Sequence, residues 1–180
     1  MSKLAFIFPG QGAQKAGMGK DFYENSEAAR SFFDQAQKIL DFDLKEMCFG
    51  EHEELNLTEY TQPCMVSVCL AIVQELKKRG INPDITAGLS LGEYAAVAAA
   101  DGMNELDAIK LVRRRGILMQ STVPAGEGAM AAVLGLDAKK IEEILESFEN
   151  VWIANYNCPG QIVITGLTNE VQQASFCLLY

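Results

Sequence analysis

The sequence predicts an α/β protein, in which helices connect the strands of a parallel sheet and a smaller α+β unit follows. Leu4–Phe8 is a continuous apolar run closed by Pro9-Gly10, as expected of a strand buried on both faces. A second short strand, 84–88, ends in a glycine turn and precedes a helix. From residue 125 the pattern changes. We therefore expect a large α/β part at 1–124 and a small α+β part at 125–180.

The elements of the first part follow from their terminal residues. Ser26 can cap a helix that reaches about Leu40. The helix over 61–79 has Pro63 near its start, and its largely apolar surface predicts that it crosses the interior. The remaining helices of this part are expected over 93–100, rich in small residues, and from Asn104 to about 121.

The second part alternates strands and helices in an order typical of a small α+β unit without its last strand. Strands are expected over 129–136, 150–157 and 161–167, and helices over 137–148 and from 168 or 169 to 180.

Composition excludes several classes of function. The formal net charge of −9 disfavours binding to nucleic acid. Five cysteines without paired spacing indicate reduced thiols rather than a metal site or a disulfide framework. The first apolar run is too short for a signal peptide, and no stretch has membrane-spanning length without charge. We expect a soluble, cytoplasmic protein that binds no membrane and no metal.

The pentapeptide Gly88-Leu89-Ser90-Leu91-Gly92 is typical of a nucleophile on a sharp strand-to-helix turn. In that geometry the Leu91 N–H and the helix N-terminus face a developing oxyanion. A glycine corner with an incidental serine is the alternative. The upstream loop "PGQGAQKAGMGKD" matches neither the dinucleotide fingerprint nor the Walker loop, so no nucleotide cofactor is predicted.

Arg115 is the arginine of the "RRR" run with the clearest functional potential. It lies four residues from both Leu111 and Met119, which predicts a place on the buried, apolar stripe of its helix, whereas Arg114 is expected to be solvated. A buried guanidinium needs an anionic partner. A structural carboxylate and a substrate carboxylate both remain open.

His52 is the one histidine of the chain, and it stands in an acidic segment predicted to be solvated. A serine hydroxyl needs a base to become a good nucleophile. The sequence offers no obvious imidazole for Ser90.

Several motifs in the same order resemble the malonyl-CoA:acyl-carrier-protein transacylases of fatty acid biosynthesis. The stretches that carry the resemblance are "FIFPGQGAQKAGMG", "TQPCMVSV", "AGLSLGEYAAVAAA", "RRRGILMQSTVPAGEGAMAAVLGLD" and "NYNCPGQIVITG". The resemblance implies an α/β-hydrolase-like parallel-sheet large lobe, incomplete here, with a partial ferredoxin-like small lobe.

The resemblance also implies roles for individual residues in a transferase. Ser90 would take malonyl from coenzyme A as an ester, and Gln11 and the N–H of Leu91 would form the oxyanion site. Arg115 would hold the malonyl carboxylate. Acyl carrier protein would then receive malonyl on its phosphopantetheine thiol, with coenzyme A entering as the thioester substrate and no other cofactor.

Two departures from the family affect this interpretation. Leu89 stands where the family commonly has histidine. The family's general base is a histidine in a Pro-Phe-His-like stretch beyond the small lobe, and residues 1–180 contain no such stretch. We therefore expect an N-terminal portion that is catalytically incomplete. One alternative is a serine esterase with an unusual base such as Lys or Glu, for which Glu93 lies one turn beyond Ser90. The others are a non-catalytic module that binds acyl groups or a carrier protein, and the related acyltransferase of a polyketide synthase or of malonate decarboxylase.

Overall fold

The computed structural model describes residues 3–123 and 126–178. It confirms a mixed α/β protein with one parallel and one antiparallel sheet. The chain divides into two compact units, one ending at Ser121 and the other beginning at Thr122. Each unit is described by itself.

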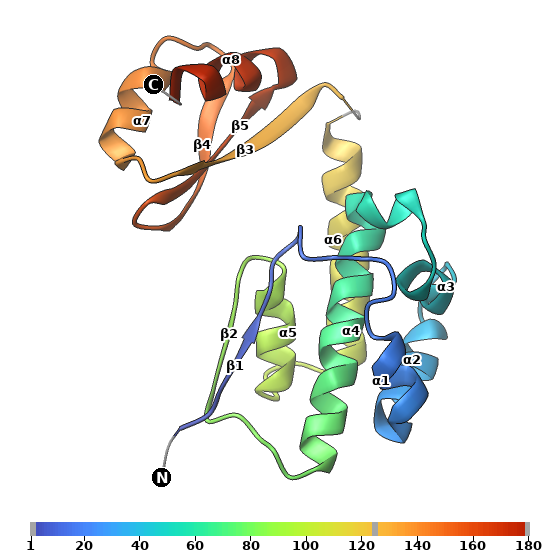
Figure 1. Cartoon of the computed structure of the whole chain (residues 1–180). Helices are drawn as coiled ribbons and strands as arrows, with labels where there is room; N and C mark the ends of the chain where they lie inside the picture. The colour runs from blue at the N-terminus through green and yellow to red at the C-terminus, as the bar shows by residue number, and fades with distance from the viewer. Residues whose placement is uncertain (1–2, 124–125, 179–180) are drawn as a thin grey trace. The chain divides into compact units, whose positions relative to one another are not determined.

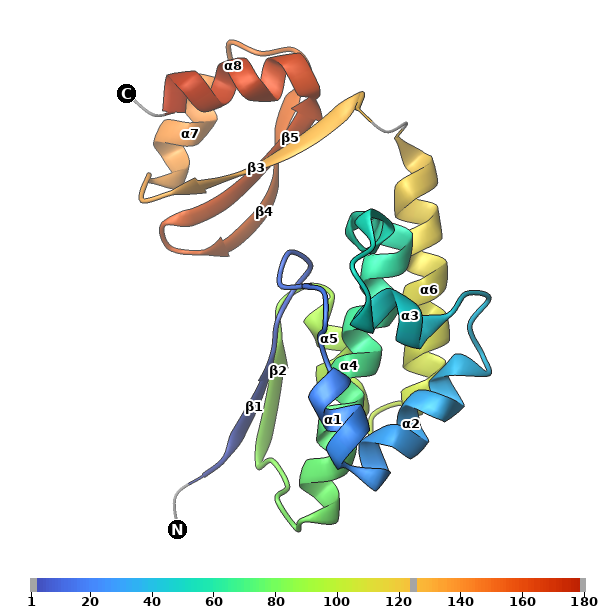
Figure 2. The same ribbon diagram turned by 45° about the vertical axis from the view of Figure 1, so that its right-hand side comes forward.

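The sheet of the first unit brings two chain segments together at one edge. Strands β1 (Ala5–Phe8) and β2 (Ile85–Gly88) are parallel, and Phe8 pairs with Gly88. Their carboxyl ends therefore lie side by side. Helices α4 (Thr58–Lys78) and α5 (Gly92–Ala99) lie on the same side of this strand pair, as Figures 1 and 2 show. Within the described part of this unit, no helix covers the other side. The predicted burial of the first strand on both faces is therefore wrong, since Ile7 is 78% exposed.

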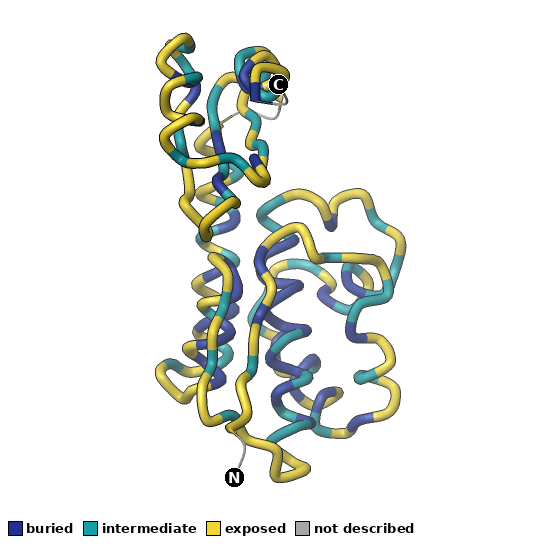
Figure 3. The backbone as a smooth tube through the Cα atoms, turned by 60° about the vertical axis from the view of Figure 1, so that its left-hand side comes forward, coloured by how far each residue is buried: buried dark blue, intermediate teal, exposed yellow. Residues whose placement is uncertain are grey.

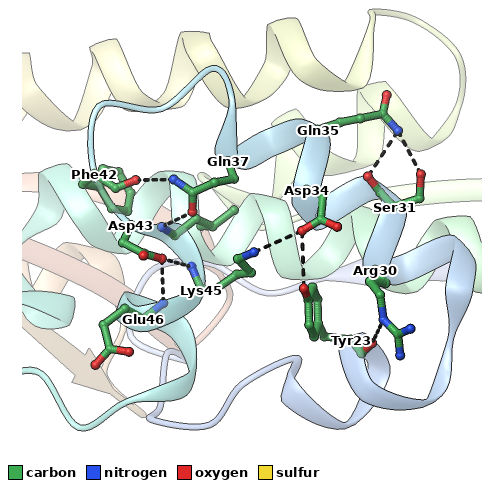
Figure 4. A network of polar contacts seen from close by, with 11 residues as sticks. Tyr23, Arg30, Ser31, Asp34, Gln35, Gln37, Phe42, Asp43, Lys45 and Glu46 are labelled. Atoms are coloured by element: carbon green, nitrogen blue, oxygen red, sulfur yellow. Dashed lines mark hydrogen bonds and ion pairs between the residues drawn. The ribbon is translucent and has the colours of Figure 1, made fainter.

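Five further helical segments complete the first unit. They are α1 (Lys20–Asn25), α2 (Glu27–Gln37), α3 (Leu44–Phe49), the 3-10 helix η1 (Glu53–Asn56) and α6 (Glu105–Thr122). The short helices α1, α3 and η1 were not predicted from the sequence. A polar network holds two of them against α2, because Asp34 accepts hydrogen bonds from Tyr23 of α1 and Lys45 of α3 (Figure 4).

Helix α4 is the central element of this core. It begins at Thr58, one turn before the predicted start, so Pro63 lies inside the helix rather than at its beginning. Every residue from 61 to 68 is buried, which confirms that the helix crosses the interior. Residues 3–5, near the N-terminal end of the chain, are in contrast exposed, as the colours of Figure 3 show.

The second unit is a three-stranded antiparallel sheet with two helices. Its elements are β3 (Gly128–Leu134), α7 (Ala138–Leu145), β4 (Val151–Cys158), β5 (Gln161–Leu167) and α8 (Thr168–Leu178). Strand β5 lies between β3 and β4 and is antiparallel to both. Ile141, Ile162 and Ile164 are central to a buried cluster that shares no residue with the core of the first unit. The predicted end of the last helix at residue 180 lies outside the described residues.

Candidate active site

Ser90 lies on a strained turn between β2 and α5. Its φ of 50° places it in the left-handed region, which only one other described non-glycine residue, Asp101, adopts. This conformation is costly for a residue with a Cβ atom and is typical of functional sites. The side chain is exposed at the carboxyl edge of the sheet. The geometry is that of the nucleophile turn that the pentapeptide suggested.

The glycines on either side of Ser90 are required by close backbone contacts. A Cβ atom on Gly88 would lie 2.1 Å from the carbonyl carbon of Gly92. A Cβ atom on Gly92 would lie 2.3 Å from the carbonyl oxygen of Phe8, at the end of β1. The turn therefore packs directly against the neighbouring strand, which no larger residue at these positions would permit.

Two backbone N–H groups near Ser90 are free to bind an oxygen. The N–H groups of Leu91 and Gln11 have no hydrogen-bond acceptor among the described residues. Each lies three residues after the end of its strand, and the two chain segments are tied together there, since Leu89 N–H donates to the Phe8 carbonyl oxygen at 3.1 Å. Unpaired N–H groups at a turn are suitable donors to an oxyanion.

Arg115 reaches the same turn from α6. Its Nη2 lies 3.5 Å from Ser90 Oγ, and its guanidinium carbon lies 5.7 Å from the centre of the Tyr94 ring. No carboxylate pairs with Arg115 among the described residues. Of the two partners that the sequence left open, the structural Asp or Glu is absent from the part of the chain that the structure describes.

Arg115 does not lie on the buried stripe of α6 that the sequence predicts. The buried residues of α6 are Ala108, Ile109, Val112 and Gly116, whereas Leu111 and Met119 are about half exposed. Arg115 lies three residues after Val112, at the border between the two faces, and is half-buried for that reason. Arg114 is exposed, as expected.

The Gln11 side chain forms hydrogen bonds with Thr58 and Gln62, two residues for which the sequence predicted no role at the site. Its Nε2 donates to Thr58 Oγ1 at 3.0 Å, and its Oε1 accepts from Gln62 Nε2 at 3.3 Å. Gln62 is buried, also contacts Met119 of α6, and has no partner for its Oε1 among the described atoms. The only sequence signal for Gln62 is its place in the "TQP" stretch, beside the proline of a predicted helix start.

His52 lies away from this turn. Its Nε2 is 3.0 Å from Glu46 Oε1 of α3, and its side chain is one-third exposed. It has no contact with Ser90. Among residues 3–123 and 126–178, no group of His, Cys, Asp and Glu side chains could hold a metal ion.

Residues 5–176 match the acyl transferase domain family. The chain belongs to this family. Since the match extends through both units, the serine turn is part of an acyl transferase domain. In the described part of this acyl transferase chain, no helix has the length and apolarity needed to span a membrane.

Several characterised members of the family are similar over nearly the whole chain. The malonyl CoA-acyl carrier protein transacylase of Bacillus subtilis is 48% identical over 97% of the chain. The solved structure of the corresponding protein from Clostridium perfringens has 42% identity and a TM-score of 0.88 over 98% of the chain. A malonyl-transacylase solved in complex with a type II polyketide synthase acyl-carrier protein has 37% identity and a TM-score of 0.89, again over 98%. The chain spans 57% of the length of the first two relatives and 59% of the third.

Proposed function

We propose that this chain contributes the nucleophile and the carboxylate-binding group of a malonyltransferase. The reaction would move malonyl from coenzyme A to the thiol of an acyl carrier protein in fatty acid biosynthesis. The observation that carries the proposal is Arg115, a half-buried arginine without a carboxylate partner among the described residues and 3.5 Å from the candidate nucleophile Ser90.

The first half-reaction follows from this arrangement. Ser90 Oγ attacks the thioester carbonyl while its proton passes to a base, and the C–S bond breaks as coenzyme A leaves as a thiol. The negative charge on the carbonyl oxygen is stabilised by the N–H groups of Leu91 and Gln11. Arg115 binds the free carboxylate of malonyl through two parallel N–H donors. In the second half-reaction, the carrier protein's thiol attacks the ester and Ser90 is released.

The named relatives support the same substrates. They are malonyl transacylases, and one was solved with an acyl-carrier protein. We propose cytoplasmic fatty acid synthesis as the setting. We further propose that residues 1–124 form the α/β-hydrolase-like lobe and residues 125–180 part of a ferredoxin-like lobe. The order of strands in the second unit, with β5 between β3 and β4, is compatible with such a lobe.

The proposal is tested by comparing the binding of malonyl-CoA and acetyl-CoA, which differ in the carboxylate, by titration calorimetry. The chain should bind malonyl-CoA about tenfold more tightly or better, as expected for a charge-assisted hydrogen-bonded pair. Arg115→Ala should remove this preference by weakening malonyl-CoA alone.

Arg114→Ala is the matched control, because Arg114 is the exposed neighbour on the same helix. It should keep the preference. Equal affinity of the unaltered chain for the two thioesters would contradict the assignment of Arg115 to a malonyl carboxylate.

A further inference from the structure

The Arg115 side chain lies between Ser90 and an aromatic ring. The guanidinium lies over the Tyr94 ring, with 5.7 Å between its central carbon and the ring centre. Tyr94 belongs to the first turn of α5, and its half-buried side chain packs against the core of the first unit. The ring is therefore a fixed platform, whereas the long arginine side chain is flexible.

The guanidinium of Arg115 lies near positive charge, which is unfavourable for a cation without an attractive partner. A helix N-terminus carries partial positive charge, and Ser90 lies just before the N-terminus of α5. Glu93 supplies negative charge in the first turn of α5, but no carboxylate forms an ion pair with Arg115 among the described residues. The negative face of an aromatic ring attracts a guanidinium and offsets this repulsion.

A ring also leaves the arginine competent to bind a ligand. Arg113, two residues earlier, has its donors occupied by Asp41 and Glu59. A ring attracts the guanidinium without taking the strong hydrogen bonds that a carboxylate accepts, so the Arg115 donors other than the one near Ser90 Oγ stay available. Tyr94 therefore supplies attraction without occupying the donors that a carboxylate would need.

We propose that Tyr94 is a positioning residue that holds the Arg115 guanidinium for a substrate carboxylate. The proposal rests on the proposed function, since it assigns to Tyr94 the orientation of the group that distinguishes malonyl from acetyl. Tyr94 touches no reacting atom, and its effect is confined to selectivity for the acidic acyl group.

The test uses the ratio of the dissociation constants of acetyl-CoA and malonyl-CoA, measured by calorimetry on the full 180-residue chain. Tyr94→Leu should lower this ratio about threefold to tenfold, with the acetyl-CoA constant unchanged. Tyr94→Phe should keep the ratio within about twofold, because the ring face is retained.

A fluorination series separates ring electrostatics from ring shape. Phenylalanine with one, two and three fluorine atoms at position 94 keeps the packing but progressively weakens the negative ring face. The ratio should fall stepwise through the series. This series also gives a result if Tyr94→Leu does not fold.

The outcomes distinguish the two proposals. In one outcome, the unaltered chain shows a large ratio of the acetyl-CoA to the malonyl-CoA dissociation constant that is lost in Arg115→Ala. If this ratio then stays constant through the fluorination series, the role of Tyr94 alone is overturned. A ratio near one in the unaltered chain would overturn both, since no carboxylate recognition would exist for Tyr94 to support.

Discussion

The turn that contains the left-handed Ser90 can pack closely because Gly88 and Gly92, two residues away on each side, lack side chains. Gly92 touches the end of β1, and Gly88 touches Gly92 itself. The position of the hydroxyl thus depends on two contacts that involve only backbone atoms. We expect small changes at these glycines to have larger effects than changes at the exposed leucine between Gly88 and Ser90.

Gly92→Ala is predicted to destabilise the first unit by about 1–3 kcal/mol, the usual cost of forcing an extra carbon into a packed site. The added Cβ would lie 2.3 Å from the Phe8 carbonyl oxygen, so β1 and α5 must separate. Chemical denaturation followed by circular dichroism measures the change.

Leu89→Ala is the control for this prediction. Leu89 belongs to the same pentapeptide but is 50% exposed, so its truncation should change stability by less than about 0.5 kcal/mol. Equal losses in the two variants would show that the close contact at Gly92 does not limit the turn.

At the scale of elements, α6 carries three consecutive arginines, Arg113 to Arg115, in different surroundings. Arg113 forms a bidentate pair with Asp41 and also donates to the Glu59 carbonyl oxygen at 2.8 Å. That carbonyl would ordinarily accept the N–H four residues later, but Pro63 has none. The proline inside α4 thus creates the acceptor that fastens α6 to it, and Arg115 follows half a turn later.

Arg113→Met is predicted to cost about 2 kcal/mol, because it leaves the Glu59 carbonyl and two carboxylates without their charged donor. Thermal or urea denaturation measures the loss. Arg114→Met is the control and should be neutral, since Arg114 is exposed. A similar loss in both variants would contradict the difference in role.

The pH dependence of this loss has a definite sign. The hydrogen bond from Arg113 holds the pKa of Asp41 below its ordinary value of 3.8. A carboxyl group whose pKa is lower in the folded state stabilises the fold at pH values above its pKa in the unfolded state. This stabilisation is lost as the pH falls through the pKa of the folded state. The difference between wild type and Arg113→Met should therefore be constant near neutral pH and shrink below about pH 4. A difference that grows on acidification would contradict this pairing.

Sequence patterns predicted the elements whose signals are local. The glycine turn around Ser90 and the strand at 161–167 agree with the structure, because apolar runs and glycines determine them directly. The run Leu4–Phe8 contains the predicted strand, but its predicted burial on both faces is wrong. Helices α1 and α3 span only six residues each, too few for a periodic pattern, and depend on contacts such as Lys45–Asp34.

The candidate site was predictable only where a motif was present. Ser90 belongs to a recognisable pentapeptide, but Gln62 and Tyr94 have no such signal, since their partners are distant in sequence. Arg115 was singled out by an argument from Leu111 and Met119 that the structure contradicts. The helical repeat shows which residues share a face of α6. It does not show which face is buried, because that depends on the elements that α6 packs against.

For the molecule as a whole, the 180-residue polypeptide is predicted to acylate slowly. Ser90 needs a proton acceptor, and the one histidine of this sequence is paired with Glu46, away from the turn. Mass spectrometry after mixing with malonyl-CoA should detect little malonyl-Ser90. Added imidazole, which can act as an external base, should increase the yield.

Ser90→Ala is the control and should remain unmodified with or without imidazole. Rapid, stoichiometric acylation without imidazole would contradict the prediction. It would instead support an internal base such as Glu93, the alternative of an unusual serine esterase.

The uncovered side of the β1–β2 pair affects how this polypeptide must be handled. Ile7 and Ile85 lie on adjacent paired strands with 78% and 62% of their surfaces exposed. Fluorescent dyes that detect melting by binding apolar surface will find such surface on the folded chain. A bright signal at low temperature would thus report the native sheet, and melting curves for the variants above are better followed by ellipticity.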